Sequence, residues 1–136
     1  MLNIIAIDHI VLRTANLKKM LAFYTKVLGC HIERETSPEL GLTQLRAGNA
    51  LIDVVDVQST LGKMGGGEPS KSENNLDHFC LRISPISDES LLAHLKKWDV
   101  ETSDFAERYG AEGFGRSLYI KDPDGNTVEL KYAKQK

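Results

Sequence analysis

Apolar and polar residues alternate in two short stretches of the chain that have almost the same sequence. Residues 8–13 read DHIVLR and residues 77–82 read DHFCLR, in a chain of 136 residues. Successive side chains of a β-strand point to opposite faces of its sheet. Each stretch therefore predicts a strand whose histidine, His9 or His78, lies on the face opposite the packed apolar side chains.

A helix is predicted after each of these strands. Apolar residues recur at helical spacing over residues 17–28 and again over residues 91–98. Asn16 is a suitable N-cap for the first helix, and Gly29 is a suitable C-terminal stop. The second helix is predicted to begin near Ser87.

Three further strands are predicted after each helix. In the first half they cover residues 30–35, 42–47 and 50–57. In the second half they lie near residues 100–105, 117–121 and 126–132. The tight turn DPDG joins the last two strands of the second half. The order strand–helix–strand–strand–strand therefore occurs twice.

This repeat predicts an α+β fold of two tandem βαβββ modules. Module 1 covers about residues 1–58 and module 2 about residues 76–136. The stretch between them, about residues 59–75, is rich in Gly, Ser, Glu and Lys, which is typical of a linker. A chain of 136 residues has the length of one ordinary domain, so both modules are expected to belong to a single domain, residues 1–136.

The composition restricts the classes of partner. Apolar residues make up 41% and charged residues 26%, as in ordinary globular proteins, and the net charge of −2 without a basic run argues against nucleic acid or a membrane surface. No apolar stretch approaches the roughly 20 residues of a membrane helix, and no secretory signal is recognisable. Cys30 and Cys80 form no disulfide framework. We therefore expect a cytoplasmic protein that binds a small molecule.

The candidate chemistry lies on the two repeated strands and on the last strand of each module. His9 and His78 occupy equivalent positions, and each module ends in an apolar run that contains a carboxylate, Asp53 or Glu129. Burying a carboxylate is costly unless it is paired or bound to a metal. Two imidazoles with one or two carboxylates suit Ni, Zn, Mn, Co or Fe(II), one divalent metal per site. The alternative is that Asp53 faces solvent, because Asp56 lies three residues further on.

Together with these residues, two longer motifs resemble the vicinal oxygen chelate superfamily, which includes glyoxalase I, fosfomycin-resistance proteins and extradiol dioxygenases. The motifs are AFYTKVLG at residues 22–29 and DPDGNTVEL at residues 122–130. The resemblance covers nearly the whole chain and implies a single glyoxalase-like domain. In this family two βαβββ modules curl their sheets around one metal-binding cup, commonly completed in a homodimer.

By position, the resemblance assigns the metal ligands. His9, His78 and Glu129 match the common metal triad, and Asp53 falls where glyoxalase I has a glutamate ligand. In a glyoxalase-I-like lyase or isomerase, Glu129 and Asp53 would be the catalytic carboxylates, which remove a proton beside a carbonyl. Arg13 matches an arginine that contacts the glutathione carboxylate, so the substrate could be a thiol adduct; the other interpretation of Arg13 is a salt bridge.

Three alternatives stay open. A fosfomycin-resistance-like thiol transferase or epoxide hydrolase is suggested by Ser117 and Tyr119, which match phosphonate-contacting residues of that group but are also ordinary strand residues. An extradiol dioxygenase would use the same triad with Fe(II). A non-catalytic small-molecule-binding module, as in bleomycin resistance, is the third; the presence of the triad argues for an enzyme instead.

Overall fold

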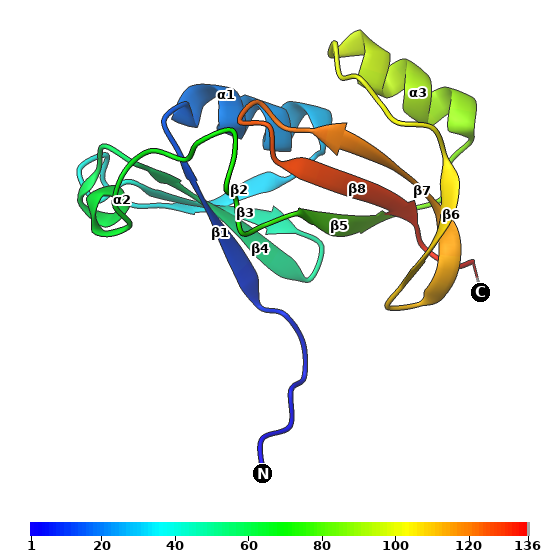
Figure 1. Cartoon of the computed structure of the whole chain (residues 1–136), viewed down its shortest axis with the longest axis horizontal. Coiled ribbons are helices and arrows are strands. Elements are labelled where there is room, and N and C mark those ends of the chain that lie inside the picture. The colour runs from blue at the N-terminus through cyan, green and yellow to red at the C-terminus, as the bar shows by residue number, and fades with distance from the viewer. Residues whose placement is uncertain (136) are drawn as a thin grey trace. The chain divides into compact units, whose positions relative to one another are not determined.

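The protein contains two compact units, each built on one four-stranded mixed sheet (Figure 1). The structure is a computed structural model that describes residues 1–135, and the units comprise residues 1–70 and residues 71 onward. The strand order is β1-β4-β3-β2 in the first sheet and β5-β8-β7-β6 in the second. In each unit a helix follows the first strand, so the predicted α+β fold with two βαβββ modules is confirmed.

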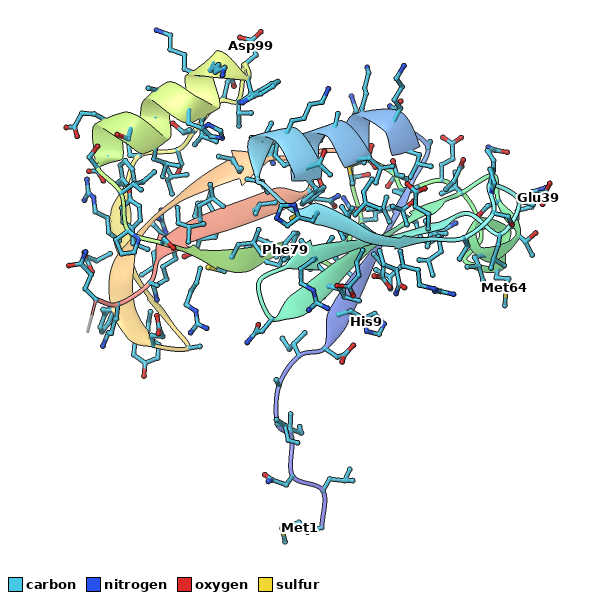
Figure 2. The ribbon with its side chains drawn as sticks, turned by 180° about the vertical axis from the view of Figure 1, so that it is seen from behind. Met1, His9, Glu39, Met64, Phe79 and Asp99 are labelled. Atoms are coloured by element: carbon cyan, nitrogen blue, oxygen red, sulfur yellow. The ribbon has the colours of Figure 1, made fainter. Side chains whose placement is uncertain are left out.

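The elements of the first unit follow the predicted order. They are β1 His9–Thr14, α1 Leu17–Ala22, the π-helical turn η1 Phe23–Val27, β2 His31–Glu35, β3 Leu42–Ala47, β4 Ala50–Asp56 and α2 Thr60–Met64. The first strand pairs in parallel with the last, β4, and the other pairs are antiparallel. Figure 2 shows His9 at the start of β1, where the extended N-terminal segment that begins at Met1 joins the sheet.

The core of the first unit lies on one face of its sheet. Leu45, Ile52 and Val54 are buried there, as are Met20 and Tyr24 of the helical segment. Residues 43, 45, 52 and 54 share this face because side chains alternate along each strand. The intervening residue of β4 therefore points to the opposite face.

A short helix, α2, lies inside the segment that the sequence indicates as a linker. Its N-cap is Ser59, whose hydroxyl oxygen accepts a hydrogen bond from the backbone N–H of Gly62 at 3.0 Å. The side chain of Arg13 donates to backbone carbonyls within this helix and after it. The helix therefore belongs to the first unit.

The second unit repeats the same order of elements. They are β5 His78–Ile83, α3 Asp88–Lys97, β6 Ala106–Gly110, β7 Gly113–Lys121 and β8 Thr127–Tyr132. The predicted helix start is confirmed, because the Ser87 hydroxyl accepts a hydrogen bond from the backbone N–H of Ser90 at 3.1 Å. The buried apolar side chains of this unit are Leu91, Leu95, Leu118, Ile120, Val128 and Leu130.

The strand predicted near residues 100–105 is wrong, since the strand at this place is β6, which begins at Ala106. The preceding segment meets β7 at one residue instead of forming a ladder. The backbone N–H of Ser103 donates to the carbonyl of Tyr119 at 2.9 Å, and the Ser103 hydroxyl accepts from the Tyr119 N–H at 2.8 Å. The Ser103 hydroxyl thus accepts the hydrogen bond that a backbone carbonyl of a neighbouring strand would otherwise accept.

Of the helices formed by residues 1–135, none is long and apolar enough to cross a membrane.

Truncating the core of the second sheet should destabilise the fold strongly. Leu118 is fully buried, so Leu118→Ala should lower the free energy of unfolding by about 2–5 kcal/mol. Leu92→Ala makes the same chemical change at a half-exposed helix position and should cost less than about 1 kcal/mol. Urea denaturation measures both; equal losses would show that Leu118 does not lie in the core.

The ion pair that ties α3 to its sheet should make stability depend on pH. Arg116 donates to Oδ2 of Asp88 at 2.7 and 3.0 Å, and the Tyr132 hydroxyl donates to Oδ1 at 3.1 Å. The Arg116 hydrogen bonds, and secondarily that of Tyr132, lower the pKa of Asp88. A carboxyl whose pKa is lower in the folded than in the unfolded chain stabilises the fold above its ordinary pKa, and this contribution is lost as pH falls through the lowered value.

Asp88→Asn should therefore reduce the thermal midpoint at neutral pH, and the difference from the parent chain should shrink below about pH 4, where the unfolded carboxyl is protonated. Glu89→Gln, at the adjacent helix position, is the matched control and should leave the pH profile unchanged. A constant difference at all pH values would contradict this role of the ion pair.

Candidate functional site

A histidine and a carboxylate share one sheet face in each unit. In the first unit Val11 of β1 is in register with Asp53 of β4, so His9, two residues before Val11, lies on the face of Asp53. In the second unit Cys80 of β5 is in register with Glu129 of β8. His78 therefore lies on the face of Glu129, opposite the buried apolar side chains.

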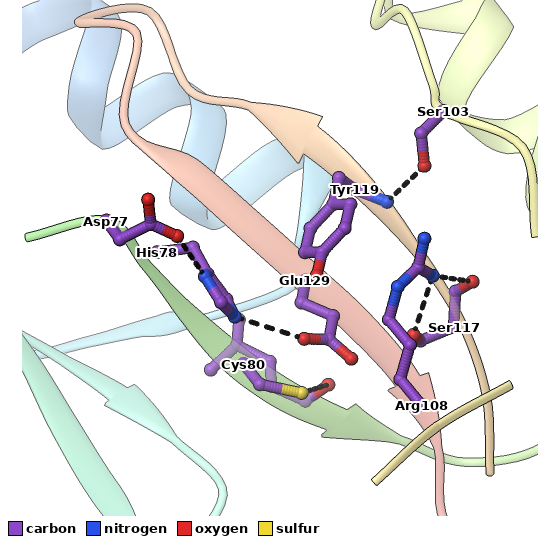
Figure 3. A network of polar contacts seen from close by, with 9 residues as sticks. Asp77, His78, Cys80, Ser103, Arg108, Ser117, Tyr119 and Glu129 are labelled. Carbon is purple, nitrogen blue, oxygen red and sulfur yellow. Dashed lines mark hydrogen bonds and ion pairs between the residues drawn. The ribbon is translucent and has the colours of Figure 1, made fainter. Parts of the chain in front are cut away.

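The imidazole of His78 lies between two carboxylates (Figure 3). Its Nδ1 is 2.7 Å from Oδ2 of Asp77, and its Nε2 is 3.3 Å from Oε1 of Glu129, which is only 6% exposed. A contact of Nδ1 with a carboxylate holds a proton on Nδ1 and leaves Nε2 as the atom that binds a proton or a metal. Two ligands about 2.1 Å from one metal ion lie roughly 3.0–3.5 Å apart at octahedral or tetrahedral angles. The spacing of His78 and Glu129 fits that requirement.

The same arrangement of aspartate and histidine occurs in the first unit. Nδ1 of His9 is 2.6 Å from Oδ1 of Asp8. This hydrogen bond is the main cause of a raised pKa of His9, and the negative charge of Asp53 raises it further. His9 is therefore oriented by one carboxylate and lies in the electric field of a second, as His78 does.

Asp53 is a buried carboxylate with an unused oxygen. The residue is 3% exposed, and its Oδ2 accepts a hydrogen bond from Nε2 of Gln44 at 3.1 Å. Its Oδ1 is buried without a hydrogen-bond partner among the described residues. An unpaired buried carboxylate oxygen is costly, and a bound cation would compensate that cost.

The neighbouring acidic residue of β4 has a different environment. Asp56 lies three residues on, so it points to the opposite face, and its Oδ1 accepts a hydrogen bond from the backbone N–H of Gln58 at 2.9 Å. Of these two carboxylates, Asp53 is the buried one.

Each histidine–carboxylate pair thus offers donor atoms that a divalent cation binds. They are an oriented imidazole nitrogen and the oxygens of a largely buried carboxylate. Within residues 1–135, no group of three or more His, Cys, Asp or Glu side chains is placed to hold a metal ion. The combination of His9, Asp53, His78 and Glu129 into one site therefore stays a prediction.

Arg13 contacts backbone carbonyls. Its Nη2 donates to the carbonyls of Gly62 and Gly66 at 2.9 and 2.7 Å, and its Nη1 donates to that of Gly67 at 3.0 Å. Its Nε is buried without a hydrogen-bond partner in the described part of the chain. These contacts hold the loop after α2, and the predicted contact of Arg13 with a substrate carboxylate stays a prediction.

Tyr119 lies at the His78–Glu129 pair, and Ser117 lies further along β7, where it contacts Arg108 (Figure 3). Tyr119 is in register with Glu129, and its ring meets the ring of His78 edge-on at 5.3 Å between centroids. Ser117 is fully buried, and its hydroxyl oxygen accepts a hydrogen bond from Nη1 of Arg108 at 3.0 Å. The binding of substrate by Ser117 and Tyr119 stays a prediction.

Arg108 is a candidate site residue that the sequence pattern did not reveal. The carbon of its guanidinium group lies 4.3 Å from the centroid of the Tyr119 ring, a cation–π contact. The expected strand ended at residue 105, so no face could be assigned to Arg108. The register of the true strand, with Ala106 opposite Ser117, places Ala106 and Arg108 on the face of Ser117.

Cys80 also lies on the face of Glu129. Part of its side chain is exposed, but the removal of the rest from water, followed by the charge of Glu129, raises the pKa of the thiol to about 11. The thiol is therefore protonated at neutral pH, and a protonated thiol is a poor nucleophile and metal ligand.

Known proteins share this architecture. A family model described as Glyoxalase/Bleomycin resistance protein/Dioxygenase superfamily matches residues 6–130. An integron cassette protein from the mobile metagenome of V. cholerae is 25% identical, with a TM-score of 0.75 over 98% of this chain and 99% of that chain.

Two solved structures with named activities share the fold at lower identity. Lactoylglutathione lyase from Agrobacterium tumefaciens is 21% identical, with a TM-score of 0.66 over 94% of this chain and 93% of that chain. The fosfomycin resistance protein FosX from Listeria monocytogenes is 22% identical, with a TM-score of 0.68 over 95% of this chain and 91% of that chain. Because the family model covers nearly the whole chain, and its repeated modules are those seen here, this protein belongs to the Glyoxalase/Bleomycin resistance protein/Dioxygenase superfamily.

Proposed function

We propose that this protein is a divalent-metal-dependent enzyme that acts on a small oxygen-rich molecule, with glyoxalase-I-like lyase or isomerase chemistry. The observation that carries the proposal is the arrangement of aspartate, histidine and buried carboxylate in both units. In each of the two units, one carboxylate orients a histidine on the face of a second carboxylate. A structural role alone does not explain this repetition. Metal-binding histidines characteristically have such an outer carboxylate partner.

The proposed metal ligands are His9, Asp53, His78 and Glu129, within one chain or across a homodimer. The bound ion, one of Ni, Zn, Mn, Co or Fe(II), would supply Lewis-acid stabilisation of an oxyanion that develops on the substrate.

The protein's own groups would orient the histidines and move a proton. Asp8 and Asp77 hold the two imidazoles in the orientation that leaves Nε2 for binding. Glu129 is the proposed general base: its Oε1 is the oxygen near His78, which leaves Oε2 for a substrate proton. Asp53, with Oδ1 free of hydrogen bonds among the described residues, is the corresponding group of the first unit. A proton taken from a carbon beside a carbonyl and returned to the neighbouring carbon gives net isomerisation without an oxidant.

A fosfomycin-resistance-like reaction, thiol transfer or epoxide hydrolysis, is the second candidate. The specific observation in its favour is that Tyr119 lies beside Glu129 and His78, and that Arg108 stacks on Tyr119 and donates to Ser117. These groups suit a substrate that carries a negative charge.

Metal content tests the shared requirement of both candidates. His9→Ala and His78→Ala should each remove most of the metal bound by the purified protein, because each removes an oriented nitrogen ligand. His31→Ala is the matched control: His31 is an exposed histidine of β2, and its loss should leave the metal content unchanged. Elemental analysis after dialysis against each candidate ion gives the result. If both substitutions left the metal content intact, the proposed function would fail.

A second matched pair tests the carboxylate of the first unit. Asp53→Asn and Asp56→Asn make the same change on opposite faces of β4. Only Asp53→Asn should weaken metal binding, and only in that variant should added metal fail to raise the thermal midpoint. Equal behaviour of the two variants would remove Asp53 from the ligand set.

Substrate screening of the metal-loaded protein separates the two reactions. Glyoxalase-like chemistry predicts consumption of methylglyoxal in the presence of a thiol, with Glu129→Gln lowering kcat at least about hundredfold because the general base is lost. The second candidate predicts consumption of fosfomycin with a thiol or with water alone. Turnover of fosfomycin without any of methylglyoxal would replace the first assignment by the second.

A further inference from the structure

We propose that residues 1–7 form an intermolecular β-strand that pairs with the same segment of a second copy of this chain. The inference goes beyond the proposed function, because it concerns assembly and depends on no metal and no substrate. It rests on the composition, the exposure and the register of a segment that adds no buried side chain to the core of the first unit.

The segment is apolar, uncharged and exposed. Its sequence is MLNIIAI, and Figure 2 shows it as an extended chain that runs from Met1 to the start of β1 at His9. In the described chain its Leu and Ile side chains are all 75–95% exposed: Leu2, Ile4, Ile5 and Ile7. An uncovered group of large apolar side chains on a folded protein marks a surface that binds another molecule.

Alternation puts apolar side chains on both faces of this segment. In an extended chain Leu2, Ile4 and Ala6 share one face. Ile5 and Ile7 lie on the opposite face. Strands that are apolar on both faces are ordinarily covered on both faces. The pattern is therefore that of a strand inside an assembly and not that of a solvated arm.

The first unit has no strand alongside this segment. β1 is parallel to β4 with His9 opposite Leu51, and the carbonyl of Asp8 accepts a hydrogen bond from the backbone N–H of Leu51 at 3.1 Å. β4 begins at Ala50, directly after the tight turn from β3, so residues 1–7 extend past its beginning. Within residues 1–135, the backbone of this segment forms no hydrogen bond, and both of its edges are open to another strand.

The same segment of a second copy is the partner that this chemistry fits. The strands at the edges of the two sheets are β1, β2, β5 and β6, and each contains charged side chains, such as Arg13, Glu33, Arg82 and Glu107. Pairing with one of these edges would put ionised groups next to Leu and Ile side chains, which costs free energy. Residues 1–7 carry no charge, so two copies of the segment can pair without this cost.

A two-fold axis makes such a pair self-complementary. When the axis is perpendicular to an antiparallel pair, each face of one strand continues into the same face of the other. With the axis at Ile4, this residue lies opposite its own copy, and Leu2 lies opposite Ala6. Cross-strand apolar pairs of this kind stabilise an antiparallel pair. Because a two-stranded ribbon is only marginally stable by itself, we expect a dimer that dissociates on dilution.

The test is the molar mass of the full chain, prepared without residues added before Met1, by analytical ultracentrifugation over a range of concentrations. The parent chain should form a dimer that dissociates on dilution. Ile4→Asp and Ile4→Lys should each raise the dissociation constant of the dimer at least about a hundredfold, because two like charges then face each other. An equimolar mixture of the two variants should dimerise again, since opposite charges meet when residue 4 lies near residue 4 of the other copy.

Met64→Asp controls for the introduced charge. It places the same carboxylate on another exposed apolar residue, at the end of α2, and should leave the dissociation constant unchanged. The thermal midpoints of both Ile4 variants, measured where the parent chain is monomeric, should equal that of the parent, because Ile4 lies outside the core. Lower midpoints would show that Ile4 is covered by its own chain and would overturn the inference.

Four further results would also overturn it. A parent chain that is monomeric at every concentration, or an Ile4→Asp variant that dimerises as the parent does, would show that the segment joins no two copies. Variants that stay monomeric when mixed would show that a different surface of the second copy covers the segment. Binding of a monomeric parent chain to phosphatidylcholine vesicles, lost in Ile4→Asp, would assign the segment to a lipid surface instead.

Discussion

The parallel pairing of the first and last strands of each unit is the constraint on which the remaining architecture depends. A parallel pair requires a crossover connection, and here that connection contains the helix and two further strands. It also puts residues from opposite ends of a module into register. Asp53 reaches the face of His9 in this way, and Glu129 reaches that of His78, although more than 40 residues separate the members of each pair. The opposite face is then left for the apolar residues that form the core.

The sheet face that carries the histidines also holds buried charged side chains, whose removal from water costs free energy. Asp53, Glu129 and Lys131 are nearly as buried as the leucines and valines beside them, so each depends on a nearby polar partner or counterion. The hydrogen bonds in the structure satisfy some of this demand, as between Gln44 and Asp53. Within residues 1–135, Oδ1 of Asp53 is buried without a hydrogen-bond partner, so part of this demand is unmet.

The repeated strands were predictable from sequence because apolar and polar residues alternate along them: the alternation that turns Leu12 and Leu81 to one face of the sheet also turns the histidine to the other. The capped helix at Ser87 was predictable for an equally local reason. Arg108 was not, because residues 100–105 have a strand-like pattern but meet β7 through a serine side chain, which moves the strand six residues along the chain. The contact of Arg13 with the loop after α2 was also hidden, since it joins residues about 50 positions apart and uses only backbone carbonyls.

This last contact has a consequence for how the protein can change over evolution. Arg13 binds main-chain oxygens, so it imposes no side-chain identity on Gly66 or Gly67, but Gly66 has a φ of +88°, a backbone conformation that favours glycine. Gly65 differs, because a Cβ there would lie 2.3 Å from Nε of Arg13. The loop that follows α2 can therefore vary in sequence at Gly67, whereas Gly65 is required for space and Gly66 for its backbone conformation.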